Sequence, residues 1–156
     1  MTTTIDLTQY ISDAIEGKRE LFTQASDRIW EFAETRFDEF QSAELLIELL
    51  ESEGFTIEKG VAGLETGFIA SYGSGLPVIA LLGEYDALAD LSQEAGISTY
   101  QPVQPRGNGH GCGHNLLGIG AVAAAVAVKD YLREHPETQG TVRFYGCPAE
   151  ESGYGK

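Results

Sequence analysis

Residues 107–115, GNGHGCGHN, place His110, Cys112 and His114 at every second position, with glycine between them. Thiolate and imidazole are side chains that bind transition metals well. In an extended segment, residues two apart point to the same side and lie about 6.6–6.8 Å apart. Glycine lets the backbone bend, so that two such side chains can close on one ion at bond lengths of about 2.0–2.3 Å. The pattern therefore indicates a metal site; a glycine-rich turn with a buried cysteine is the alternative.

A second candidate feature is the carboxylate pair Glu150 and Glu151, which lies between Pro148 and Gly153 in a predicted tight turn. In metal-dependent hydrolysis one carboxylate can bind the metal, while the other acts as a general base on the attacking water. A solvated acidic turn is the alternative for this pair. Asp86 follows a predicted strand, where it can accept a hydrogen bond from a ligating imidazole or form an Asx turn.

Hydrophobic periodicity predicts a chain of helices and short strands that must position these residues. The continuous apolar run from Val78 to Leu82 predicts a strand that is covered on both faces. Asn115 is a predicted helix N-cap, and residues 85–113 form a loop of a length that is typical of functional loops. The predicted helices span residues 6–34 with a break near Gly17, 38–53 and 116–134, and the predicted strands span 55–62, 66–73, 77–85 and 141–147.

The strand at 78–83, the helix at 116–134 and the strand at 141–147 form a predicted βαβ unit with parallel strands and a right-handed crossover. The carboxyl ends of parallel strands and the N-terminus of the crossover helix share one edge of the sheet, where ligands of α/β proteins bind. The positive end of the helix dipole should also favour the thiolate of Cys112. The residues expected at this edge are Glu84, Asp86, Cys112, His114, Glu150 and Glu151.

The composition, with 42% hydrophobic and 22% charged residues among 156, is that of a globular chain with one domain. The net charge of −14 argues against binding to nucleic acid or to an anionic membrane surface. The apolar run at 116–128 is too short to span a bilayer, whose hydrocarbon core is about 30 Å thick. The first ten residues lack a secretion signal. With only Cys112 and Cys147, a disulfide framework is not indicated, although a single bridge stays open, and we expect a cytoplasmic location.

Three segments, GEYDALADLSQ at 83–93, GHGCGHNLLG at 109–118 and VRFYGCPAEESGYGK at 142–156, together resemble the di-metal amidohydrolase, aminoacylase and carboxypeptidase family. They are most similar to its branch of aminobenzoyl-glutamate hydrolases of the B-subunit type. The resemblance implies divalent metal ions, zinc or manganese, with two ions in the full-length protein. Glu84 stands where many relatives have a metal-binding histidine, and it is not counted as a ligand. The implied metal ligands are Cys112, His114 and Glu151, the implied general base is Glu150, and the implied orienting aspartate is Asp86.

The resemblance also implies an α/β fold with a three-layer arrangement, a mixed sheet with helices on both faces, as in zinc exopeptidases. Family members are longer, and their remaining metal-binding histidines and a lid domain lie downstream of the Glu-Glu pair. We therefore expect residues 1–156 to be the N-terminal part of a single catalytic domain, incomplete and without the lid and dimerisation domain. The full-length protein is then expected to form a homo- or hetero-oligomer through that lid.

The expected function is metal-dependent hydrolysis of the amide bond of an N-acyl or N-aroyl amino acid, similar to aminobenzoyl-glutamate, or of a small peptide. A truncated, non-catalytic remnant or partner subunit is the first alternative. A nucleotide-binding module, suggested by G-x-G-x-x-A at 118–123, is disfavoured because that pattern lies inside the predicted helix. A thiol hydrolase using Cys112 and His114 is disfavoured because residues two apart rarely hold nucleophile and base in register. The role of His110 stays open.

Overall fold

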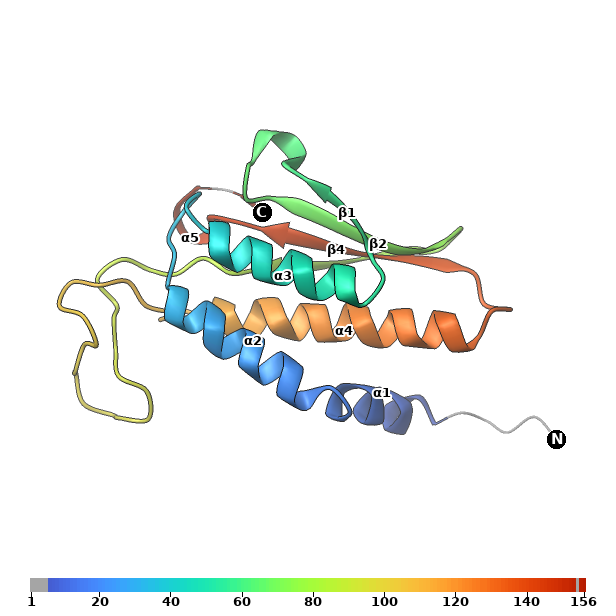
Figure 1. The fold of residues 1–156 in the computed structure, drawn as a ribbon, viewed down its shortest axis with the longest axis horizontal. Coiled ribbons are helices and arrows are strands. Elements are labelled where there is room, and N and C mark those ends of the chain that lie inside the picture. Colours follow the sequence, from blue (N-terminus) through green and yellow to red (C-terminus); the bar gives the residue numbers. More distant parts are fainter. Residues whose placement is uncertain (1–5, 154) are drawn as a thin grey trace.

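The computed structural model describes residues 6–153, 155 and 156, and its elements follow the order predicted from the sequence (Figure 1). The break near Gly17 divides the first predicted helix into two helices, as expected. The helices are α1 (Leu7–Glu16), α2 (Arg19–Phe32), α3 (Phe40–Ser52), α4 (His114–Glu134) and the short α5 (Glu150–Gly153), with a 3-10 turn η1 (Val61–Gly63). The strands are β1 (Thr56–Lys59), β2 (Phe68–Ser74), β3 (Val78–Glu84) and β4 (Gly140–Cys147).

The four strands form one mixed sheet in the order β1-β2-β4-β3. β1 and β2 pair antiparallel, as do β2 and β4, whereas β3 and β4 are parallel, from Val78 opposite Thr141 to Glu84 opposite Cys147. The helix that connects β3 to β4 is α4, so the predicted βαβ unit is confirmed. It brings the ends of β3 and β4 and the start of α4 to the same edge.

One face of the sheet is covered by α3 and α4, and both α1 and α2 pack against α4 (Figure 1). Phe68, Val142 and Phe144 point from this face into the core, where they join apolar side chains of these helices. The mixed α/β class is therefore confirmed. Of the three layers expected, the described residues form two, because their long helices all lie on one face.

The prediction that both faces of β3 are covered is wrong for the described part of the chain. β3 is an edge strand, and Val78, Ile79 and Leu82 are 47%, 49% and 44% exposed. The apolar run still favours a strand, because β-branched residues such as Val78 and Ile79 are enriched in strands. The sequence pattern could not show which neighbours cover it.

Helix α4 is the central helix of the fold, packed between the sheet and α2. By length and composition alone, α4 is apolar enough to cross a membrane. More than half of its apolar stretch is, however, buried inside the fold, as is usual for a core helix. Gly118 lies where α4 crosses the end of β3, and a Cβ atom there would lie 2.5 Å from the carbonyl oxygen of Glu84. The glycine therefore serves close packing, and G-x-G-x-x-A lies inside the helix, as expected.

Residues 85–113 form the irregular loop that the sequence predicts, and the loop projects from the body of the fold (Figure 1). An isolated bridge between Leu88 and Gly109 closes its base, with backbone hydrogen bonds of 3.0 and 2.9 Å. A further hydrogen bond of 2.7 Å, from the N–H of Ala87 to the carbonyl oxygen of Glu34, ties the loop to the end of α2. The loop thus returns its last residues to the edge where β3 ends.

Candidate metal centre

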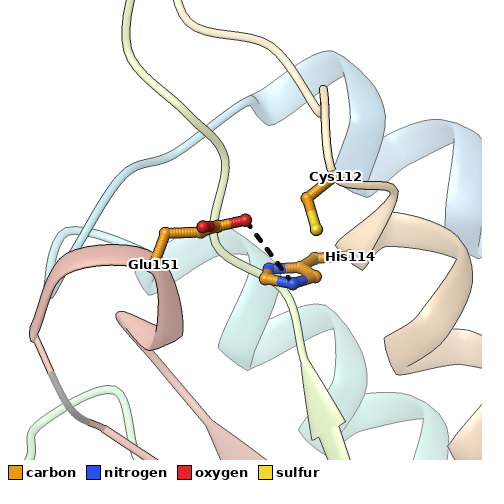
Figure 2. A group of neighbouring side chains, drawn as sticks. All are labelled: Cys112, His114 and Glu151. Atoms are coloured by element: carbon orange, nitrogen blue, oxygen red, sulfur yellow. Dashed lines mark ion pairs between the residues drawn. The ribbon is translucent and has the colours of Figure 1, made fainter.

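Three segments that are distant in the sequence meet at this edge of the sheet. Asp86 follows β3, Cys112 and His114 lie at the start of α4, and Glu151 lies in α5 after β4. One ligand atom from each of Cys112, His114 and Glu151 lies within 4.8 Å of the others, and all three side chains point toward one another (Figure 2). The structure thus brings together the three residues expected to bind metal.

The ring of His114 is buried and oriented by Asp86. Its Nδ1 lies 2.8 Å from Oδ1 of Asp86 and 3.2 Å from the carbonyl oxygen of the same residue. Both oxygens accept hydrogen bonds, so Nδ1 carries the proton and donates. The lone pair of Nε2 is then available, and this is the form of imidazole that binds a metal. The other oxygen of Asp86, Oδ2, accepts the backbone N–H of Glu151 at 2.9 Å, so one carboxylate positions two of the candidate ligands.

The Nε2 atom of His114 faces several acidic groups. It lies 3.2 Å from Oε2 of Glu84, 3.8 Å from Oε1 of Glu151 and 3.9 Å from Oε2 of Glu150. Carboxylates this close repel one another, and a divalent cation relieves that repulsion. Thiolate, imidazole and carboxylate together suit zinc, and the imidazole and carboxylate groups also suit manganese. The donor set therefore fits a divalent transition metal.

Glu84 belongs to this cluster, although the sequence analysis did not count it as a ligand. Its side chain is buried, and together with His114 and Glu150 it forms a second group whose ligand atoms lie within 4.8 Å of one another. Its other oxygen, Oε1, pairs with the ammonium group of Lys156. The sequence feature that points to Glu84 is its spacing of two residues from Asp86, because an extended chain directs two such residues to the same side.

Glu150 and Glu151 occupy the first turn of the short helix α5 rather than the tight turn that the sequence predicts. The side chain of Glu150 is 33% exposed, so water reaches its carboxylate. The residue before it, Ala149, has a positive φ of 54°. This is an unusual backbone conformation for a residue other than glycine. The sharp bend directs both carboxylates back toward His114.

A buried carboxylate that the sequence analysis missed, Glu39, holds that bend in place. Its Oε1 accepts the backbone N–H of Ala149 at 2.8 Å, and its Oε2 accepts the hydroxyl of Thr66 at 3.2 Å. Burial raises the pKa of Glu39 above its usual range, against the lowering effect of these hydrogen bonds. No local pattern could have identified it, because 110 positions separate it from Ala149.

The expectation that the start of α4 favours the thiolate of Cys112 is not met. The neighbouring Glu151 carboxylate, slight burial and the charges of Glu150 and Glu84 raise the pKa of Cys112. These carboxylates oppose the effect expected of the helix dipole. Cys112 is exposed and Cys147 is buried at the end of β4. Both thiols are free, so the two cysteines form no bridge.

His110 and Asn115 point toward α2, not into the metal centre. The Nε2–H of His110 donates to the carbonyl oxygen of Ile29 at 3.0 Å, and burial lowers the pKa of this imidazole. Asn115 is not the N-cap, because α4 begins at His114, two residues earlier than predicted, after Gly113 with a left-handed φ of 83°. The side chain of Asn115 instead donates to Oγ of Ser26 at 3.1 Å.

Comparisons with known proteins identify relatives of this chain. Residues 80–156 match the model of a family described as Peptidase family M20/M25/M40. The chain is 57% identical over 151 residues to the B subunit of p-aminobenzoyl-glutamate hydrolase from Escherichia coli strain K12, and the match covers 97% of this chain and 31% of that protein.

Two solved structures share the fold. A putative aminohydrolase from methicillin-resistant Staphylococcus aureus aligns with a TM-score of 0.73 at 21% identity, over 92% of this chain and 35% of its own. The YXEP protein of Bacillus subtilis, a dinuclear metal-binding peptidase of the M20 family, aligns with a TM-score of 0.63 at 26% identity, over 85% of this chain and 36% of its own. The chain spans about a third of the length of each of these relatives.

Proposed function

Because the chain belongs to the peptidase family M20/M25/M40, we propose that residues 1–156 are the N-terminal part of the catalytic domain of a metal-dependent amide hydrolase. The proposed substrate is an N-aroyl or N-acyl amino acid. The first compound to test is p-aminobenzoyl-glutamate, which appears in the name of the relative that is 57% identical.

The observation that carries this proposal is the convergence of three segments on the Nε2 atom of His114, while Asp86 holds its Nδ1. Cys112, His114 and Glu151 are the proposed metal ligands. A divalent cation bound there, zinc or manganese, polarises the amide carbonyl and makes water more acidic at neutral pH. The full-length protein is proposed to bind two such ions, with further ligands from outside these residues.

The chain's own residues divide the remaining tasks. A carboxylate oxygen of Glu150 takes the proton from the attacking water and passes it to the nitrogen of the leaving amine. Its partial exposure leaves it accessible to both. Asp86 keeps the proton of His114 on Nδ1 and holds the backbone N–H of Glu151, so that the two candidate ligands keep their positions.

The proposal also covers the partners and the location. Assembly with further subunits through a lid domain is supported by the name of the relative, which is a subunit of its enzyme. A cytoplasmic location is supported by the two free cysteines. The net charge of −14 supports a small-molecule substrate over nucleic acid or an anionic membrane surface.

The test is hydrolysis of p-aminobenzoyl-glutamate by the complete native protein that carries this sequence. We expect a chelator to abolish the release of p-aminobenzoate and zinc or manganese to restore it. Glu150→Ala should abolish turnover and leave the metal content intact, whereas Cys112→Ser should lower the affinity for metal. Glu58→Ala, on exposed β1, is the matched control and should behave as the wild type.

Near-normal turnover by Glu150→Ala contradicts the assignment of the general base, and unchanged metal affinity in Cys112→Ser removes that residue from the ligand set. Activity that survives chelation but is lost in Cys112→Ser would indicate the thiol hydrolase. Metal binding without hydrolysis of any amide tested would favour a non-catalytic role.

A further inference from the structure

Three polar side chains from residues 108–115, the segment that carries Cys112 and His114, hold this segment against helix α2. Asn108 donates to the carbonyl oxygen of Ala33 at 3.1 Å, and His110 donates to that of Ile29 at 3.0 Å. Asn115, at the start of α4, donates to the hydroxyl oxygen of Ser26 at 3.1 Å. We call Asn108, His110 and Asn115 the α2 clamp. Two of its three members use carbonyl groups at the end of α2, and one of these, the carbonyl of Ile29, also accepts the backbone N–H of Ala33 at 3.2 Å.

His110 is the member of the α2 clamp that lies nearest to the candidate ligands in the sequence, two residues before Cys112. Its ring is largely buried, and among the described residues its Nδ1 has no hydrogen-bond partner. Its one polar contact is therefore the bond from Nε2–H to Ile29. That bond fixes the direction of the side chain, and the side chain fixes the place of the backbone.

The backbone on either side of His110 has little room to move. A Cβ atom on Gly109 would lie 2.1 Å from the carbonyl oxygen of Leu91, and one on Gly111 would lie 2.6 Å from the Leu91 side chain. The carbonyl oxygen of His110 accepts the N–H of Gly113 at 3.2 Å, which closes the turn that carries Cys112. The same residue thus contacts α2 through its side chain and shapes the Cys112 turn through its backbone.

We propose that His110 is a positioning residue for the metal centre: its Nε2–H, anchored on the carbonyl of Ile29, holds the Cys112 turn so that the thiol faces His114 and Glu151. This inference rests on the proposed metal-binding function. It assigns a role to the first histidine of the motif, which points away from the metal centre. Without the hydrogen bond from His110 to Ile29, the loop still contains all of its candidate ligands, but Cys112 no longer has a fixed position.

The test uses cobalt(II) as the probe, because a cysteine thiolate bound to cobalt gives a charge-transfer band in the near ultraviolet. Cobalt is titrated into the metal-free complete native protein and into His110→Gln, His110→Asn and His110→Ala. The side-chain N–H of glutamine lies close to the place of the histidine Nε2–H, whereas that of asparagine lies near Nδ1 and falls short of Ile29. His135→Gln, at the far end of α4, is the matched control.

We expect His110→Ala and His110→Asn to weaken cobalt binding by about 10–100-fold, the usual effect of removing a group that orients a metal ligand, and to reduce the charge-transfer band. His110→Gln should restore most of both, and His135→Gln should match the wild type. If His110→Ala fails to fold, as judged by circular dichroism, the comparison of His110→Asn with His110→Gln decides.

Equal cobalt affinity and an equal band in His110→Asn and the wild type would overturn the inference and leave the proposed function intact. An equal loss in His110→Gln and His110→Asn would also overturn it, because packing alone would then explain the effect. A wild-type protein that binds cobalt without any thiolate band would contradict the ligand set itself, and with it both proposals.

Discussion

Replacing Asp86 by asparagine tests whether one buried carboxylate orients the candidate metal centre. The carboxylate of Asp86 accepts two hydrogen bonds, one from Nδ1–H of His114 at 2.8 Å and one from the N–H of Glu151 at 2.9 Å. Asparagine has nearly the same shape but offers one acceptor oxygen and one NH₂ donor. In either orientation of the amide, a donor therefore faces a donor. If the NH₂ group faces His114, Nδ1 can accept a hydrogen bond from it only when the imidazole proton moves to Nε2. In that tautomer Nε2 cannot bind a metal.

The size of the effect follows from these two contacts. Hydrogen bonds to charged groups contribute about 1.5–3 kcal/mol each. Loss of a group that orients a ligating histidine lowers metal affinity by about 10–100-fold, or about 1.4–2.8 kcal/mol. Because the two ranges overlap, loss of one of the two bonds accounts for the whole expected change. We therefore expect Asp86→Asn to weaken zinc binding by about 10–100-fold.

Zinc affinity is measured by competition with a chromophoric chelator, in the complete native protein. Asp27→Asn, at an exposed position of α2, makes the same chemical change away from the metal centre and should leave the affinity unchanged. Urea unfolding of the metal-free proteins checks that Asp86→Asn still folds. An equal zinc affinity for Asp86→Asn and the wild type would refute the argument, because it would show that the tautomer of His114 does not depend on Asp86.

Two further predictions concern groups that support the fold. Because burial raises the pKa of Glu39, the folded wild type should lose stability as the pH rises from the unfolded pKa of about 4.3 through the folded one. Glu39→Gln, which keeps an acceptor for Ala149, should remove that loss in urea titrations across this range, and an unchanged pH profile would contradict it. Lys129→Met removes a buried ammonium group that lies 2.8 Å from Glu53 and 2.7 Å from Asp130. This should lower the free energy of unfolding by about 3 kcal/mol, and a change below about 0.5 kcal/mol would refute it. Burial alone would raise the pKa values of Glu53 and Asp130, but hydrogen bonds from Lys129 keep both below their usual range. The wild type should therefore lose stability as the pH falls through the pKa values of these two carboxyls, and Lys129→Met should lose less.

The meeting of Asp86, His114 and Glu151 could be predicted from the sequence because it depends on topology alone. A parallel βαβ unit must place the ends of both strands and the start of its helix at one edge, whatever the details of packing. Recognising β3, α4 and β4 from their apolar patterns was therefore enough to place these side chains near one another.

The directions of individual side chains could not be predicted in the same way. Strict alternation would direct His110, Cys112 and His114 to one side, but the turn from His110 to Gly113, closed by the hydrogen bond between these two residues, directs His110 away from the other two. The partner of His110, Ile29, is 81 positions away, and its contact depends on how α2 packs against α4. Glu39 is a similar case, since nothing in its neighbourhood distinguishes it from an exposed acidic residue.

Each part of the candidate centre is held by a polar side chain that is not itself one of the proposed metal ligands. Asp86 orients His114 and the backbone of Glu151, Glu39 holds the bend before α5, and His110 holds the turn of Cys112. These supports make separate contacts, Asp86 and His110 from the loop at 85–113 and Glu39 from the start of α3. A centre of this kind binds its metal with little rearrangement, and its affinity then depends on the supporting groups as well as on the ligands. This is why the most informative substitutions are those of Asp86 and His110, which leave every candidate ligand in the sequence and change only how it is held.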